Sequence, residues 1–183
     1  MRVSATKAIC DRILVGVHRR VEGVDDVDGF LLAASADWFL VRQCDALIPD
    51  GLWLFRKDTV TAFQRSQFHQ FKEQMMEGAG LLRRVSMTPD IDLTSIETIV
   101  EWFFRTKRLC ILRIENTYEW WRVHCAIDGL SGQHIRLRPF DGAGQWEKVR
   151  ITGRWRSNVI TAIYFDSHYL RLYERNIMRR RCK

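Results

Sequence analysis

Arginines and tryptophans near the C-terminal end are the residues of this chain with the clearest chemical potential. Arginine and lysine neutralise phosphate groups, and tryptophan rings stack on unpaired bases, each stack contributing ~1–3 kcal/mol in proteins that use it. Interleaved in one segment, these residue types favour a surface for single-stranded RNA. Alternatively, the tryptophans fill the ends of a folded barrel and the arginines form a solvated face. The candidate set comprises Arg136, Arg138, Trp146, Lys148, Arg150, Arg154, Trp155, Arg156, Arg179, Arg180 and Arg181.

No catalytic pattern accompanies this set. A nucleophilic serine or cysteine needs a base within hydrogen-bond reach, and the chain has no Gly-x-Ser-x-Gly motif. On a strand, the adjacent His124 and Cys125 point to opposite faces. The histidines and cysteines lack metal-ligand spacing, so a metal site would need ligands from distant segments. The carboxylates of Asp25-Asp26 and Asp90-x-Asp92 lie in loop-like sequence. We predict no catalytic residue, no cofactor and a protein that is not an enzyme.

Positive charge is concentrated in the second part of the chain. Residues 101–183 contain 17 Lys and Arg against 8 Asp and Glu, a net charge of +9, whereas residues 1–100 contain 12 against 14, a net charge of −2. Such asymmetry is typical of a protein with a nucleic-acid or acidic partner. A basic surface that serves only solubility is the alternative.

The composition is that of a globular protein. Of the 183 residues, 46% are hydrophobic and 28% are charged, enough for one sizeable core or two small ones. No apolar run approaches the ~20 residues that cross a bilayer, and the N-terminal sequence lacks a signal-peptide core. We therefore expect a cytoplasmic protein without a membrane partner and with reduced cysteines.

The elements that must position the candidate residues are arranged in a pattern that occurs twice. Thr6, Lys7 and Cys10 recur 100 residues later as Thr106, Lys107 and Cys110, and Val60-Thr61-Ala62 recurs as Ile160-Thr161-Ala162. Ser35, Phe39, Val41, Arg42 and Asp45 match Ser131, Ile135, Leu137, Arg138 and Asp141 at a spacing of 96. Ordered matches with one four-residue gap, at the loop 142–146, favour an internal duplication over coincidence.

Each copy is rich in short strand-like segments. They are 8–18, 30–34, 38–44, 52–56 and 59–63 in the first copy, and 108–116, 120–127, 134–140, 148–153 and 158–165 in the second. In the segment 134–138, alternation places Ile135 and Leu137 on one face and both arginines on the other. Five short strands in about 60 residues favour a strongly bent antiparallel barrel. We predict a mainly β (α+β) protein with two tandem five-stranded small barrels, at 1–63 and 106–183, the second with a basic C-terminal tail.

The segment 64–105 between the barrels breaks the strand pattern and predicts a helical linker with a capping helix. Phe68, Phe71 and Met75 have helical spacing before Gly78-Ala79-Gly80, and Thr94 and Glu97 fit a capping box. Ile96, Ile99, Val100 and Phe103 then form an apolar stripe. Because burial requires this spacing, we expect both apolar stripes to seal a core.

A short helix before a five-stranded bent barrel resembles the Sm-like and SH3-like small-barrel families. In the second copy, Ile151-Thr152-Gly153 followed by Val159-Ile160-Thr161-Ala162-Ile163 is similar to their strand signature, although Thr152 stands where arginine is usual. The whole chain looks like a group of bacterial proteins with tandem small barrels. Its motifs are Asp28, Gly29, Ser35 and Trp38 in the first copy, and Asp141, Gly142, Gly144, Trp146, Ile160, Thr161, Phe165 and Asp166 in the second. The resemblance implies a fold and no known activity.

Two functional hypotheses follow. The first is a non-catalytic module that binds single-stranded RNA or another polyanion through the basic second barrel. The second is a protein-interaction or self-association module, because small barrels leave strand edges unpaired and the 7 tryptophans are residues that commonly anchor interfaces.

Overall fold

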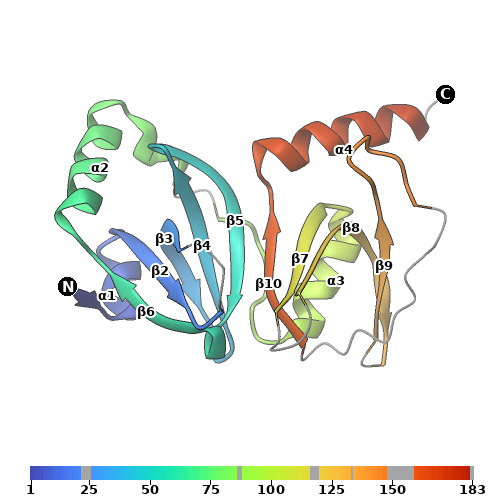
Figure 1. The fold of residues 1–183 in the computed structure, drawn as a ribbon, viewed down its shortest axis with the longest axis horizontal. Coiled ribbons are helices and arrows are strands. Elements are labelled where there is room, and N and C mark those ends of the chain that lie inside the picture. The colour runs from blue at the N-terminus through green and yellow to red at the C-terminus, as the bar shows by residue number, and fades with distance from the viewer. Residues whose placement is uncertain (22–25, 86–87, 116–119, 133, 148–158, 182–183) are drawn as a thin grey trace. The chain divides into compact units, whose positions relative to one another are not determined.

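The computed structural model describes residues 1–21, 26–85, 88–115, 120–132, 134–147 and 159–181 (Figure 1). The chain forms two compact units, Met1–Asp90 and Ile91–Lys183. Both combine antiparallel strands with helices, so the chain belongs to the mainly β, α+β class that the sequence predicts. In the described part of the chain, no helix has the length and apolar character needed to span a membrane.

The first unit is built on a six-stranded antiparallel sheet. Its elements are β1 (Arg2–Val3), α1 (Ala5–Cys10), β2 (Leu14–Arg19), β3 (Val27–Ala34), β4 (Trp38–Asp45), β5 (Ile48–Arg56), η1 (Lys57–Thr59), β6 (Val60–Gln64), α2 (Gln67–Gly78) and η2 (Leu81–Arg84). The strand order within the unit is β1-β6-β2-β3-β4-β5. Met76 of α2 packs with Leu14, Phe30 and Cys44 in the core on one face of this sheet.

The predicted five-stranded barrel is not confirmed for this unit, because the sheet is not closed. Closure would require β6 to pair with β5, but the two edges of β6 are occupied by β2 and by β1. The strand β1 has only two residues, too few for its sequence to give a periodic signal. The predicted strand from residue 8 is also wrong at its start, because Ser4 caps the helix α1 and β2 begins only at Leu14.

The second unit places a four-stranded described sheet between two helices. Its elements are α3 (Ile96–Thr106), β7 (Leu109–Glu115), β8 (Trp120–Ser131), β9 (His134–Pro139), β10 (Ile160–Phe165) and α4 (His168–Arg181), with strand order β10-β7-β8-β9. Trp102 and Phe103 of α3 contact Phe165 on one face, and Leu170 and Ile177 of α4 pack on the opposite face. The described strands form an open sheet rather than the predicted barrel, and the predicted strand 148–153 lies outside the described residues.

Helix α3 confirms the predicted apolar stripe, since Ile99, Val100 and Phe103 are fully buried. The predicted capping box is shifted by one residue. Ser95, not Thr94, accepts the hydrogen bond from the backbone N–H of Thr98, and the hydroxyl of Thr98 accepts one from the N–H of Ser95.

The two units share one plan. In each, a helix precedes the first strand of the shared plan, which is β2 or β7. This strand is flanked by β3 and β6 in the first unit and by β8 and β10 in the second, and a second helix follows β6 or β10; β1 is additional to the plan. The extra residue of a β-bulge is Leu32 in β3 and Asp128 in β8, which are 96 residues apart. This correspondence of strands and bulges supports the duplication.

The helices that follow the sheets correspond as well, at a spacing of 101. Ser66 and Ser167 cap α2 and α4 by accepting a backbone N–H in the first turn. Glu73 then accepts the backbone N–H of Leu14, and Glu174 accepts that of Leu109, so each glutamate ties its helix to the start of the first strand. The first matches found in the sequence are not equivalent in the structure: Cys10 ends α1 and is exposed, whereas Cys110 lies buried in β7.

The predicted role of Phe68, Phe71 and Met75 as a core seal is wrong. Their exposed fractions are 60%, 56% and 48%. The helix α2 turns its polar residues inward instead, because Glu73 bonds to the first strand and His69 and Lys72 both contact the carboxylate of Asp28 in β3. These contacts orient the helix and leave an apolar stripe facing solvent.

Candidate functional site

A tight loop after β9 fixes the position of Trp146. The carboxylate of Asp141 accepts the backbone N–H groups of Ala143 and Gln145 at 2.9 and 2.8 Å, a local bond pattern typical of aspartate in turns. Gly144 has a φ of 69°, and a Cβ there would lie 3.2 Å from the ring of Tyr173. A side chain at this position would therefore be strained, and the loop is the one that the sequence places at 142–146. It brings Trp146 back to pair with Phe140.

Arg138 reaches Trp146 from the neighbouring strand. The predicted alternation in β9 is confirmed: Ile135 and Leu137 are buried, and Arg136 and Arg138 are directed to the other face. The guanidinium carbon of Arg138 lies 4.3 Å from the centre of the Trp146 ring. A cation over an indole face at this distance contributes about 0.5–2 kcal/mol, depending on solvent access. The pair therefore places a positive charge against an aromatic ring.

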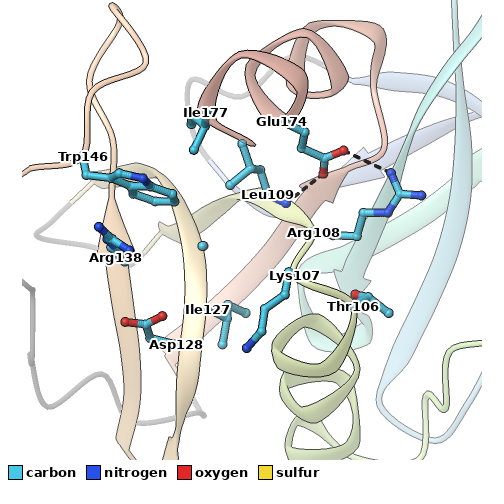
Figure 2. Close-up of a pocket in the computed structure, with 11 residues that line it drawn as sticks. Thr106, Lys107, Arg108, Leu109, Ile127, Asp128, Arg138, Trp146, Glu174 and Ile177 are labelled. Atoms are coloured by element: carbon cyan, nitrogen blue, oxygen red, sulfur yellow. Dashed lines mark hydrogen bonds and ion pairs between the residues drawn. The ribbon is translucent and has the colours of Figure 1, made fainter. Parts of the chain in front are cut away.

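The Arg138–Trp146 pair forms part of the wall of a cavity of about 390 Å³ (Figure 2). Figure 2 shows Lys107 and Arg108, which connect α3 to β7, on the side opposite Trp146, Arg138 and Asp128. The volume falls within the range of small-molecule sites. The lining residues are Thr106, Lys107, Arg108, Leu109, Ala126, Ile127, Asp128, Arg138, Trp146, Glu174 and Ile177.

The backbone at the helix end sets the place of Lys107. Lys107 has a φ of 56° and ends α3 in the left-handed conformation, and its N–H bonds to the carbonyl of Phe103. The ammonium group lies 3.7 Å from the centre of the Phe104 ring. Such a cation–π contact holds the charge at the rim of the cavity.

Two charged residues of the lining, Glu174 and Arg108, take part in contacts that hold the second unit together. Glu174 accepts the backbone N–H of Leu109 at 2.9 Å and a hydrogen bond from Arg108 at 3.1 Å. Arg108 also lies 3.5 Å from the carboxylate of Asp166. This network attaches α4 to β7 and neutralises Arg108, whereas Lys107 and Arg138 supply cations and Asp128 supplies a carboxylate to the remaining lining.

The structure brings together only part of the predicted set. Arg138 and Trp146 are in contact, and Arg136 is exposed on the same strand, where it donates to the carbonyl of Asp128 at 3.5 Å. Arg179, Arg180 and Arg181 belong to α4, but their side chains lie outside the described residues. The remaining predicted residues, Lys148, Arg150, Arg154, Trp155 and Arg156, also lie outside the described ranges. Lys107 and Asp128 were missed by sequence reasoning, because a helix end and a bulge position them.

A second polar cluster lies in the first unit. Ser66 Oγ is 2.8 Å from His69 Nδ1, and His69 Nε2 is 3.0 Å from the carboxylate of Asp28, which also contacts Lys72 at 2.6 Å. Burial alone would raise the pKa of Asp28, but the hydrogen bonds and charges of Lys72 and His69 lower it overall. The Ser66 and His69 side chains each bond to the backbone N–H of the other, so this cluster is a capping box that fixes α2 to β3.

Within the described ranges, no group of three or more histidine, cysteine or acidic side chains is arranged to hold a metal ion. Comparison with protein-family models, curated proteins and solved structures finds no match to this chain. Its function therefore has to be inferred from the chemistry of its own residues.

Proposed function

We propose that the second unit binds single-stranded nucleic acid, RNA in particular, and acts as a binding module without catalysis. The observation that supports this function best is the Arg138–Trp146 pair in the wall of a cavity, with Lys107 across from it. Unpaired bases stack on aromatic rings and guanidinium planes, and cations nearby neutralise their phosphates.

The charge of the two units agrees with this proposal. The unit Ile91–Lys183 contains 17 basic and 10 acidic residues, whereas Met1–Asp90 contains 12 of each. The whole net charge of +7 therefore belongs to the second unit. We also infer that both units derive from one small Sm-like or SH3-like plan, which their shared strand order supports, without closure into a barrel.

A salt titration tests the proposed function. Binding of the intact protein to a fluorescently labelled single-stranded RNA is measured by anisotropy at increasing salt. We expect binding at low salt and a linear fall of log affinity with log salt, with a slope of about −0.7 for each phosphate contacted. Absence of affinity at low salt, or affinity with no salt dependence, contradicts the proposal. Double-stranded RNA of the same sequence is the control, because its stacked bases cannot reach the Arg138–Trp146 pair.

A protein-interaction module is the second candidate. It is favoured by the stripe of Phe68, Phe71 and Met75 on α2, because large apolar side chains that face solvent together commonly mark interfaces. The test combines the mass of the protein in solution with affinity capture from nuclease-treated lysate, for the wild type and a Phe68→Ser, Phe71→Ser variant. A monomeric mass and no stoichiometric partner would contradict this candidate. A partner that binds the wild type but not the variant would support it.

A further inference from the structure

The two units have a cavity at the same place in their common plan. In the first unit, a cavity of about 260 Å³ is lined by Ile9, Cys10, Arg12, Phe30, Leu31, Leu32, Val85 and Thr88. Phe30 pairs with Leu14 as Ala126 pairs with Leu109, and Leu32 and Asp128 are the corresponding bulge residues. Each cavity also has a basic residue of positive φ after its first helix, Arg12 (49°) or Lys107 (56°).

The residues that line the two cavities differ at corresponding positions of one strand, which is apolar in β3 and carries a small residue and a carboxylate in β8. Phe30 occupies the position of Ala126, and Leu32 occupies that of Asp128. The counterpart of Arg138 is Arg42, which is buried and donates to the carbonyl of Gly51 at 3.5 Å rather than to a cavity. The second cavity is the larger one and combines a carboxylate, a cation at the rim and the Arg138–Trp146 pair.

We propose that the second cavity holds one nucleotide of the bound strand and prefers guanine, an inference that rests on the proposed function. The base stacks against the Arg138–Trp146 pair, Asp128 receives its Watson–Crick edge, and Lys107 contacts the phosphate. The two oxygens of a carboxylate can accept hydrogen bonds from two parallel N–H donors at once. Among the four bases, only guanine presents such a pair, its N1–H and its 2-amino group. The bulge explains how Asp128 reaches the lining, because bulges redirect a side chain beside a site.

The experiment uses the intact protein with guanosine and inosine 5′-monophosphates, which differ only in the 2-amino group. Affinities are measured by isothermal titration, and labelled RNA is titrated in parallel. We expect inosine monophosphate to bind about tenfold more weakly, because it cannot form one of the two charge-assisted hydrogen bonds to Asp128. Equal affinities, or no affinity for either nucleotide, would overturn the proposal.

Two variants carry residues of the first unit into the second. Ala126→Phe places the bulk of Phe30 at the corresponding position of the second cavity, and we expect loss of nucleotide binding because the base no longer has room beside the Arg138–Trp146 pair. Asp128→Leu copies Leu32, and we expect the ratio of guanosine to inosine affinity to fall to about one. Asp128 is partly exposed, so this variant tests the proposal even if Ala126→Phe fails to fold. Arg105→Ala removes an exposed charge outside the lining and should leave the ratio unchanged.

The outcomes separate this inference from the proposed function. Salt-dependent RNA binding that persists unchanged in folded Ala126→Phe, with no affinity for nucleotides, would overturn the cavity site and leave the RNA function standing. Guanosine-selective nucleotide binding that Asp128→Leu abolishes, without any RNA affinity, would support the site and overturn the proposed RNA function. An unchanged preference in Asp128→Leu would overturn the assigned role of Asp128.

Discussion

Arg138 combines a planar guanidinium group with a permanent positive charge, and a lysine at the same position would keep only the charge. Its planar guanidinium lies over Trp146, and its charge is permanent. The substitution Arg138→Lys keeps the charge and removes the stacked plane. We expect RNA affinity to fall about three- to tenfold at every salt concentration while the salt slope stays the same, because stacking does not release counterions.

Anisotropy titrations at three salt concentrations check this expectation, with Arg105→Lys as the matched control on an exposed surface of the same unit. An unchanged affinity with an unchanged slope would show instead that Arg138 acts only as a charge, which the lysine retains.

His124 makes the stability of the second unit depend on pH. It lies against Phe140 and Tyr169, and burial, followed by the charge of Arg122, lowers its pKa below the ordinary value of 6.5. The unfolded chain therefore takes up this proton at a higher pH than the folded chain. The stability is complete above pH 6.5 and decreases as the pH falls from there through the lowered pKa.

Urea unfolding midpoints between pH 8 and pH 5 test this, for wild type and His124→Gln. The wild type should lose more stability than the variant across that range. Because both proteins contain the other histidines, the difference between them reports on His124 alone. Parallel curves for the two proteins would show that His124 does not contribute.

At the scale of elements, the sequence predicts what periodicity and local turn chemistry determine. The alternation of β9, the apolar stripe of α3 and the loop at Gly144 are all local patterns, and all three are confirmed. The orientation of α2 is not local, because the contacts of its polar residues with distant strands override its apolar spacing. The site was predictable to the same extent: Arg138 and Trp146 came from composition, whereas Lys107 depends on a backbone conformation without a sequence signal.

Glu73 and Glu174, which attach α2 and α4 to the strands β2 and β7, should contribute to the stability of the fold. The side chain of Glu174 is 17% exposed and accepts the backbone N–H of Leu109. Removing the acceptor leaves that donor unpaired at a partly buried position, at a cost of about 1–3 kcal/mol. We expect Glu174→Ala to lower the free energy of unfolding by this amount, and Glu174→Gln by less, since the amide oxygen still accepts.

Glu73 should behave in the same way in the first unit, because it accepts the N–H of Leu14 and a bond from Arg65. Urea denaturation followed by circular dichroism measures all four variants. Glu77→Ala, on the exposed side of α2, is the control. If the two alanine variants at Glu73 and Glu174 were no less stable than this control, the correspondence between the helices would have no energetic basis.

The two units of the molecule share one arrangement of strands and helices but differ in charge and in the residues that line their cavities. The first unit has balanced charge and a cavity whose lining strand is apolar, whereas the second carries the net positive charge and the cavity with the Arg138–Trp146 pair. A duplicated fold allows such divergence, because one copy can keep the structural role of these positions while the other gains a binding site. The position of the charge, rather than its total, should then determine affinity for RNA.

Two double variants of equal net charge test this at the scale of the molecule. Arg136→Gln with Arg138→Gln removes two cations from the second unit, and Arg83→Gln with Arg84→Gln removes two exposed cations from the first. Both lower the net charge from +7 to +5. We expect the first pair to reduce the magnitude of the salt slope of RNA binding by about 1.4, because each of the two phosphates that is no longer neutralised accounts for about 0.7. We expect the second pair to leave the slope unchanged. Equal reductions in both variants would mean that RNA responds to total charge, and the second unit would then have no special role in binding.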